Sequence, residues 1–246
     1  MKLKILSIAI SVLMLSFVFT SCNEADDTAR WQNIVTYQGM QNNYSAVSWQ
    51  QDMNSQPITL LVGVDLSTLT SGTSTPPGTR IYIDFITEDN VSTLSNNMII
   101  ERKNINELFV VKTLQPSMES QLPPQGWNDE PQQYIISLYR NGSYLNMSSL
   151  VSAMTNTETM KMTFYVDPQT VGRETVISYL SYENPTPYDR NQVSYTYLNC
   201  MDITSLMNSG SKNLIVNFNN VNPGVNQYVT YGSVATDYQS VTIPLN

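Results

Sequence analysis

The sequence of 246 residues contains no histidine. This absence excludes Ser-His-acid catalytic triads, Cys-His nucleophile pairs and metal sites with imidazole ligands, because each of them needs that side chain. Three kinds of chemistry stay open: hydrolysis by carboxylates alone, a Ser-Lys arrangement, and calcium bound by oxygen ligands. No loop matches the alternating acidic spacing of a calcium loop, so we predict no metal and no other cofactor.

Cysteine is almost as scarce, with two residues in the chain. Cys22 follows the N-terminal apolar segment and is a candidate for lipidation, which leaves Cys200 without an intramolecular disulfide partner. The apolar sequence around Cys200 predicts a buried small side chain rather than a reactive thiol. Packing must then stabilise the fold without disulfides.

Basic residues are also few, with 12 Lys and Arg against 20 Asp and Glu and a formal net charge of −8. Phosphate backbones are bound through clustered Lys and Arg, so we do not expect a nucleic-acid partner. Only 13% of the residues are charged. The surface must therefore be largely Asn, Gln, Ser, Thr and Tyr, a composition that suits contacts with glycans or with other proteins.

Long apolar runs are absent except for one, Ile5 to Phe19, which follows two lysines and ends in small residues before Cys22. This is the layout of a secretory signal peptide, and the run is shorter than a typical transmembrane helix. The end of the run, Phe19-Thr20-Ser21-Cys22, resembles the lipobox of bacterial lipoproteins, in which cleavage leaves an N-terminal cysteine that carries diacylglycerol. We predict a signal peptide over residues 1–21 and lipidation of Cys22. The alternative is an ordinary secreted protein.

An acidic segment, Asn23 to Asp27, follows this cysteine. It resembles the surface-export signal of lipoproteins from the Bacteroides group, although a solvated tether is the simpler interpretation. We assign residues 22–32 to an acidic tether. We expect the protein to be lipid-anchored at the outer membrane, facing the periplasm or exposed on the cell surface.

Helical periodicity is missing as well. Apolar segments are short and alternate with polar residues, as in Ile58 to Val64 and Ile81 to Phe85, and turn residues separate them. This pattern predicts an all-β fold of sandwiches or barrels. Asn141-Gly142 predicts a type I′ hairpin turn, since both central residues of that turn need positive φ. Asp202 predicts one short helical turn as an N-capping acid.

Prolines concentrate in residues 116–131, which we interpret as a linker, because proline cannot donate to a β-ladder. The alternative is a long loop within one sandwich. The linker divides an N-terminal β domain, residues 33–115, from a C-terminal domain, residues 132–246. The latter has about seven or eight candidate strands, which is the number in a β-sandwich.

Several segments, in their order along the chain, resemble the NigD-like lipoproteins of Bacteroides-type bacteria. The resemblance implies an N-terminal OB-like small barrel and a C-terminal β-sandwich, with no enzymatic activity and no established ligand. Cys22 is the only functional residue that it carries over. An OB barrel usually has a helix between its third and fourth strands, and we identify no segment of this sequence as that helix. The segments are Gly78 to Phe85, Tyr134 to Leu138, Gly142 to Asn146, Leu180 to Tyr182 and Asp202 to Leu206.

Aromatic side chains are the best candidates for ligand contact. Trp31, Trp49 and Trp127 all lie in polar or loop-like sequence. Flat rings at such positions can stack on sugars or anchor a protein interface. Each ring can instead pack inside a domain.

Carboxylates are weaker candidates. Asp84 and Glu88 lie on either side of Phe85, and Asp129 and Glu130 lie in the linker. A glycosidase needs two carboxylates facing one another across a sugar, whereas strand alternation predicts that Asp84 is simply solvated. We therefore expect no catalytic residue, and a non-catalytic envelope module that binds an unidentified protein or glycan. The alternatives are a hydrolase that uses carboxylates only and a bacteriocin-associated immunity lipoprotein.

Overall fold

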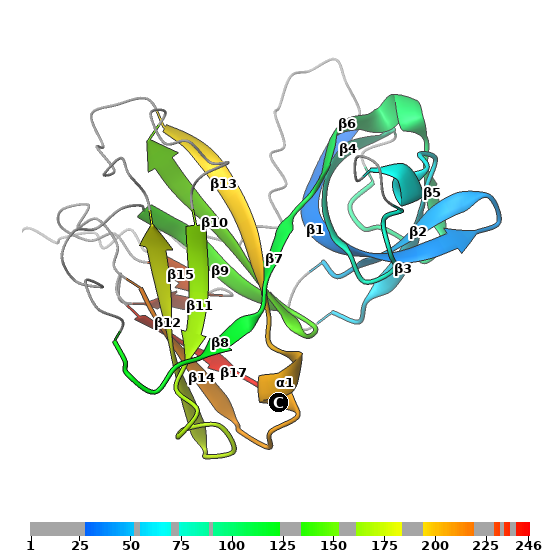
Figure 1. Ribbon diagram of the computed structural model, residues 1–246. Coiled ribbons are helices and arrows are strands. Elements are labelled where there is room, and N and C mark those ends of the chain that lie inside the picture. The colour runs from blue at the N-terminus through cyan, green and yellow to red at the C-terminus, as the bar shows by residue number, and fades with distance from the viewer. Residues whose placement is uncertain are drawn as a thin grey trace, which may run out of the picture.

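The computed structural model describes residues 28–51, 55–69, 74–88, 91–123, 134–152, 161–183, 194–218, 229–231, 234–236 and 240–246. The regular elements of this part of the chain are almost all strands, which confirms the all-β prediction. One curled sheet lies beside two sheets that pack face to face (Figure 1). Within these ranges no helix has the length and apolar character needed to cross a membrane. The predicted signal peptide and Cys22 lie outside them.

The N-terminal sheet has six strands in the order β5-β3-β2-β1-β4-β6. β3 and β5 are parallel, and the other neighbours are antiparallel. The two end strands follow one another along the chain through the 3-10 turn η2, so the curled sheet forms the OB-like barrel with its last strand in two pieces. The elements are β1 (Thr28–Gln41), β2 (Tyr44–Trp49), β3 (Ile58–Val62), β4 (Arg80–Glu88), β5 (Met98–Ile100), η2 (Arg102–Asn104) and β6 (Ile105–Val110).

A single 3-10 turn, η1 (Leu66–Thr68), lies between β3 and β4, at the place where OB barrels usually have a helix. The carboxylate of Asp65 caps it by accepting a hydrogen bond from the Ser67 N–H at 2.9 Å. Leu66 is fully buried in the barrel core. Three residues are too few to give a periodic pattern, which is why the sequence contains no signal for this turn.

The barrel begins earlier than predicted. β1 starts at Thr28, so residues 28–32 belong to the barrel and the tether ends before them. Ala29 and Trp31 point into the core, whereas Arg30 and Gln32 lie on the outer face. These outward polar residues gave the segment the composition of a tether, although its alternation is that of a strand.

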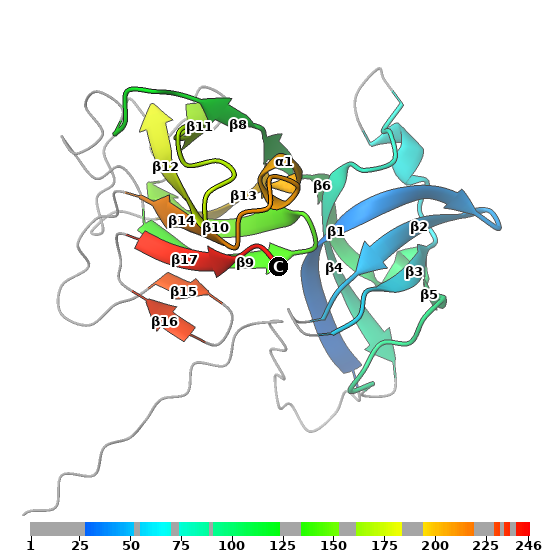
Figure 2. The same ribbon diagram turned by 90° about the horizontal axis from the view of Figure 1, so that it is seen from below.

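The C-terminal unit is a sandwich of two sheets, with strand orders β16-β15-β9-β10-β13-β7 and β17-β14-β12-β11-β8 (Figure 2). Inward residues from both sheets, among them Leu138, Phe164 and Met201, form one core. The elements are β7 (Lys112–Leu114), β8 (Pro116–Met118), β9 (Tyr134–Asn141), β10 (Tyr144–Ser152), β11 (Lys161–Val166), β12 (Thr175–Glu183), β13 (Ser194–Asp202), α1 (Thr204–Met207), β14 (Asn213–Asn217), β15 (Val229–Tyr231), β16 (Val234–Thr236) and β17 (Ser240–Pro244).

The boundary between the two units lies at Val111 rather than at residue 115. β7 runs parallel to β13, and β8 runs parallel to β11, so the start of the predicted linker belongs to the sandwich. Pro116 occupies the first position of an edge strand, where the missing N–H is tolerated. Residues 105–118 therefore supply an edge strand to each of the three sheets in turn, β6, β7 and β8.

The β9–β10 hairpin is present, but its turn differs from the prediction. Asn141 pairs with Tyr144, which makes Gly142 and Ser143 the central residues, and of these only Gly142 has positive φ. The predicted type I′ turn is therefore wrong; glycine at the first central position is the arrangement of a type II′ turn. The short helix after Asp202 is confirmed as α1, and the Asp202 carboxylate accepts a hydrogen bond from the Thr204 N–H at 2.9 Å.

Candidate functional site

A pocket of about 630 Å³ opens at the barrel rim, between the β1–β2 hairpin and the chain that follows β3. Asn42 and Asn43 form the hairpin turn, with φ of 50° and 68°. These angles are those of a type I′ turn, which asparagine tolerates better than most residues. We call this the rim pocket, and its lining residues are Met40, Asn42, Asn43, Tyr44, Gly63, Val64 and Asp65.

Ser45 joins the two sides of the rim pocket, and Gly63 packs against the barrel behind it. The buried Ser45 hydroxyl accepts a hydrogen bond from the Leu66 N–H at 2.9 Å and lies 3.4 Å from the Met40 sulfur. Gly63 lies against the β5–η2 connection, where an added Cβ would be 3.3 Å from the Ile100 carbonyl oxygen. A larger residue at position 63 would therefore crowd the seam of the barrel behind the pocket.

The polar groups of the rim pocket are two amides, one phenol and one carboxylate. That carboxylate, on Asp65, already accepts hydrogen bonds from the Ser67 N–H at 2.9 Å and from its hydroxyl at 2.6 Å. A single carboxylate does not provide the acid pair of a glycoside hydrolase. Amides, a phenol and one acceptor are suited to binding hydroxyl groups, with Tyr44 also offering a ring face.

The tryptophans proposed for ligand contact lie elsewhere. Trp31 and Trp49 are each 1% exposed, so both belong to the barrel core and neither can stack on a ligand. Their rings meet edge to face, with centroids 6.3 Å apart, and the Trp31 indole N–H donates to the Thr87 hydroxyl at 3.0 Å. Polar neighbours on the outer face made their sequence context misleading. Trp127 lies outside the described residues.

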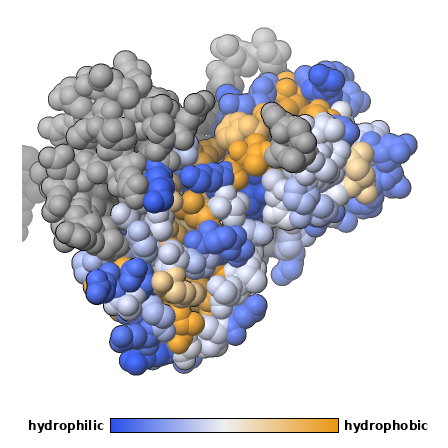
Figure 3. Space-filling model, in the orientation of Figure 1, coloured by the Kyte–Doolittle hydropathy of each residue, from blue (hydrophilic) through white to orange (hydrophobic). Residues whose placement is uncertain are grey.

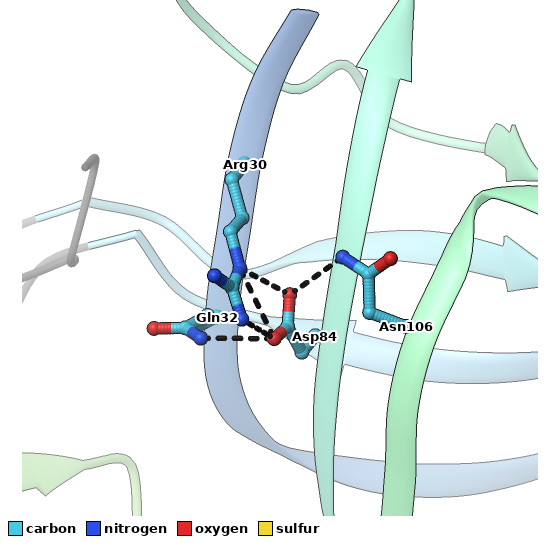
Figure 4. A network of polar contacts seen from close by, with 4 residues as sticks. All are labelled: Arg30, Gln32, Asp84 and Asn106. Carbon is cyan, nitrogen blue, oxygen red and sulfur yellow. Dashed lines mark hydrogen bonds and ion pairs between the residues drawn. The ribbon is translucent and has the colours of Figure 1, made fainter. Parts of the chain in front are cut away.

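A second polar site lies on the outer face of β4, centred on Asp84 (Figure 4). Arg30 and Gln32 reach it from β1, and Asn106 reaches it from β6. The nitrogen-to-oxygen distances to the carboxylate are 3.0 Å from Arg30 Nε, 2.9 Å from Gln32 and 3.2 Å from Asn106. The prediction that Asp84 is solvated is wrong, since these side chains leave it 1% exposed. The side chains of Glu88, Asp129 and Glu130 lie outside the described part of the chain.

The network keeps Asp84 ionised. Burial acts to raise the pKa of this carboxyl, but the hydrogen bonds from Arg30, Gln32 and Asn106 outweigh burial and hold the pKa below its usual value. The hydrogen bond to Asp84 in turn raises the pKa of Arg30. A carboxylate that is charged and fully hydrogen-bonded is a poor general acid, because it holds no proton near neutral pH.

The depressed pKa predicts a pH-dependent contribution to stability. An unfolded Asp titrates near about 3.9, above the folded Asp84, so the unfolded state takes up the proton first. The stabilisation is complete above that pH and is lost as pH falls through the folded pKa. At pH 7, Asp84→Asn should lower the free energy of unfolding by about 1–2 kcal/mol, since the partners of a charged acceptor lose strength.

Denaturant unfolding between about pH 3 and pH 7 measures this difference. It should shrink as the pH falls. The exposed pair Lys103–Glu101, at 3.4 Å, provides the control, and Glu101→Gln should change stability little at any of these pH values. A cost of Asp84→Asn that stays constant with pH would contradict the assignment.

A third polar cluster joins the barrel to the sandwich. Arg80, which is 1% exposed, extends from β4. Its Nη2 donates to the Ile34 carbonyl oxygen and to Asn146 Oδ1, both at 2.9 Å, and its Nη1 donates to Thr36. The guanidinium carbon lies 4.6 Å from the centre of the Tyr144 ring. Arg80 therefore contacts both units at once.

On the sandwich side, Arg80 meets one row of residues that crosses four strands. Tyr139, Asn146, Cys200 and Thr113 are successive partners across β9, β10, β13 and β7. The Tyr139 hydroxyl donates to Asn33 Oδ1 of the barrel at 3.1 Å. Around these contacts lies a small apolar cluster of Ile34, Val111, Cys200, Tyr82, Tyr144 and Leu198.

This junction is structural in character. No carboxylate is among the hydrogen-bond partners of Arg80, burial lowers its pKa, and its Nε has no partner among the described residues. The predicted burial of Cys200 is confirmed. Burial raises the pKa of its thiol, although Thr113 and Arg80 act in the opposite direction. Sequence alternation offered no sign that Arg80, an outward strand residue, would be covered by a second domain.

Comparison with known proteins gives the fold. No protein-family model and no curated protein matches the sequence. The chain is similar to a solved protein of unknown function, DUF1344, from Bacteroides vulgatus, with a TM-score of 0.52 and 13% identity over 87% of this chain and 89% of that one. It is also similar to an uncharacterized protein from Parabacteroides merdae, with a TM-score of 0.50 and 7% identity over 87% and 99%.

A third similar structure is a NigD-like immunity protein from Bacteroides caccae, with a TM-score of 0.45 and 14% identity over 86% of this chain and 90% of that one. At these identities the likeness concerns the fold.

Proposed function

We propose that this chain is a non-catalytic binding module of the bacterial envelope, held there by lipid on Cys22, and that its rim pocket binds a glycan. The observation that carries the proposal is the composition of the rim pocket. It combines a tyrosine ring, two asparagine amides and a carboxylate in an open cavity of about 630 Å³.

The chemistry of a sugar fits this set of groups. Sugar hydroxyls exchange hydrogen bonds with amides and carboxylates, and the apolar face of a sugar ring packs on an aromatic ring. The cavity volume lies within the range of about 300–1,000 Å³ that is usual for small-ligand pockets. OB barrels bind oligosaccharides beside the loop between their first two strands. Here that loop is the Asn42-Asn43 turn, and this point rests on analogy of fold.

Two further observations support a role without catalysis. The rim pocket contains one carboxylate, and Asp84, the other candidate acid with a described side chain, is engaged by three neighbours.

The proposal is tested by measuring the binding of a purified chain starting at Thr28 to a panel of bacterial and host polysaccharides. At least one glycan should bind, and Tyr44→Ala should weaken that binding by about tenfold or more, as expected when a stacking ring is lost. After cells that produce the full chain are lysed and fractionated, binding of the same glycan should be found in the membrane fraction. Cys22→Ala should move this binding to the soluble fraction.

The turn residues offer a matched pair of variants. Asn43→Gly keeps the positive φ at no steric cost but removes an amide from the pocket, so it should weaken glycan binding while leaving the hairpin intact. Tyr165→Ala, on the sandwich strand β11, is the control and should bind as the parent does. Release of free sugar during incubation, or glycan binding unaffected by both pocket variants, would refute the proposal.

A further inference from the structure

Within the described part of the chain, β6 has one side free for pairing. It lies at the end of the barrel sheet, and β4 is its one partner among the described strands. The Val111 N–H donates to the Arg80 carbonyl oxygen at 2.9 Å, and this bond identifies which residues of β6 direct their backbone groups toward β4. Because backbone groups alternate in direction along an antiparallel strand, Glu107 and Phe109 face β4, whereas Leu108 and Val110 turn their N–H and C=O groups outward. No described residue hydrogen-bonds to these outward groups.

Exposed apolar side chains accompany the free edge. Phe109 is 37% exposed and Val110 is 36% exposed, and Figure 3 shows hydrophobic residues gathered over β6 where the barrel faces the sandwich. The Phe109 ring stacks on Tyr82 with centroids 5.0 Å apart and an interplanar angle of 29°. Ile34, Tyr82 and Phe109 are successive partners across β1, β4 and β6. This row begins at the domain junction and ends, uncovered, at the edge of the sheet.

We propose that β6 pairs antiparallel with β6 of a second copy of this chain, about a twofold axis that passes beside Phe109. Only an extended polypeptide offers a row of donors and acceptors at the spacing of a strand edge. In a twofold antiparallel pair, outward-facing groups must oppose outward-facing groups. This condition places Leu108 opposite the partner's Val110, and Phe109 opposite the partner's Phe109.

The sequence of β6 is complementary to itself in this register. The two phenylalanines meet at a pair without hydrogen bonds, where Cα atoms are about 4.5 Å apart and side chains are closest. Aromatic cross-strand pairs of this kind are favourable. Glu107 lies opposite the partner's Val111, so like charges do not face one another. The row of Ile34, Tyr82 and Phe109 continues into the same row of the partner, which covers the exposed ring.

Two neighbouring registers also place outward-facing groups opposite outward-facing groups, but they are less favourable. Pairing centred on Leu108 would set the charged Glu107 beside the partner's Phe109, and pairing centred on Val110 would leave Phe109 without an aromatic partner. The register centred on Phe109 is therefore the one that satisfies both the backbone edge and the exposed side chains.

Sedimentation equilibrium of residues 23–246 over about a 100-fold range of concentration tests the association, because a dimer forms by mass action. The mass should rise from one copy to two. Phe109→Lys places like charges directly opposite one another and should weaken the dimer by about tenfold or more, whereas Phe109→Tyr should retain it. A single-copy mass at every concentration would overturn the proposal.

Val110 provides a test of the edge itself. Val110→Pro removes an outward N–H but no bond to β4, so the fold should be retained while the dimer is lost. Val110→Thr keeps this N–H together with a β-branched side chain, and it should dimerise as the parent does. A Val110→Pro chain that folds and still dimerises would show that the contact lies elsewhere.

Disulfide trapping tests the register. Under oxidising conditions Phe109→Cys should form a covalent dimer, since a Cα separation of about 4.5 Å lies within disulfide range. Glu107→Cys, two residues away on the same face, should not. The buried Cys200 does not interfere. Trapping through position 107 in place of position 109 would overturn the twofold pairing about Phe109.

Discussion

Replacing Trp49 with alanine should lower the free energy of unfolding of the barrel by about 4 kcal/mol, as for other large-to-small changes at buried aromatic positions. Trp49 is among the largest fully buried side chains. Its ring meets Phe85 edge to face at 5.6 Å and Trp31 at 6.3 Å. Trp49→Ala would remove both contacts and leave a cavity at the centre of a small barrel. Few other side chains are there to collapse into that space.

Trp49→Phe is the informative companion. The buried Trp49 indole N–H has no hydrogen-bond partner among the described residues, so removing it relieves the cost of an unsatisfied donor. Trp31→Phe instead breaks the hydrogen bond to Thr87. Urea unfolding followed by circular dichroism should therefore show a smaller loss for Trp49→Phe than for Trp31→Phe. Equal losses at the two positions would contradict this account of the barrel core.

Replacing Arg80 with alanine should cost about 3 kcal/mol and should weaken the contact between barrel and sandwich. The variant removes the donors to the Ile34 carbonyl oxygen and to Asn146, and both acceptors stay buried. It also removes the guanidinium from the Tyr144 ring, a cation–π contact away from water. The loss should appear in denaturant unfolding, with limited proteolysis reporting on cleavage near Val111.

A double-mutant cycle separates the junction from general packing. Arg80→Met keeps much of the apolar stem but has no donors, and Asn146→Ala removes the facing acceptor. The two single changes should be coupled by about 1 kcal/mol or more, because they act on one hydrogen bond. The pair Arg80→Met and Asn217→Ala, with Asn217 on the sandwich strand β14, should be additive. Additivity at Arg80 and Asn146 would mean that this hydrogen bond does not join the two units.

The all-β fold was predictable from the alternation of apolar and polar residues along the strands. Segments such as Ile81 to Phe85 face the core at every second residue, and nothing in their environment overrides that pattern. Two predictions that failed concern the side chains that cover the outer face of a strand. Arg30 and Gln32 look like tether residues, and Asp84 looks solvated, because alternation describes one strand and is silent about side chains that arrive from its neighbours.

The candidate site was beyond sequence analysis for a similar reason. The rim pocket joins a hairpin turn to the residues after β3, and Asp65 and Tyr44 become neighbours only when the barrel curls. The prediction of ligand contact by Trp31 and Trp49 failed because a tryptophan among polar residues has the same local sequence pattern whether its ring points outward or into the core. Asn42-Asn43 was the one local signal, as a pair that tolerates positive φ, and it indicates a turn without indicating a pocket.

The strand edges contributed by residues 105–118 also determine an order of events during synthesis. β6 finds β4 within a short stretch of chain, so the barrel can close once Val110 has left the ribosome. Thr113 must wait for Cys200, 87 residues later, before β7 has its neighbour. Pairings of such long range form slowly. The barrel can therefore be complete while both sheets of the sandwich, including the one that contacts Arg80, are still being made.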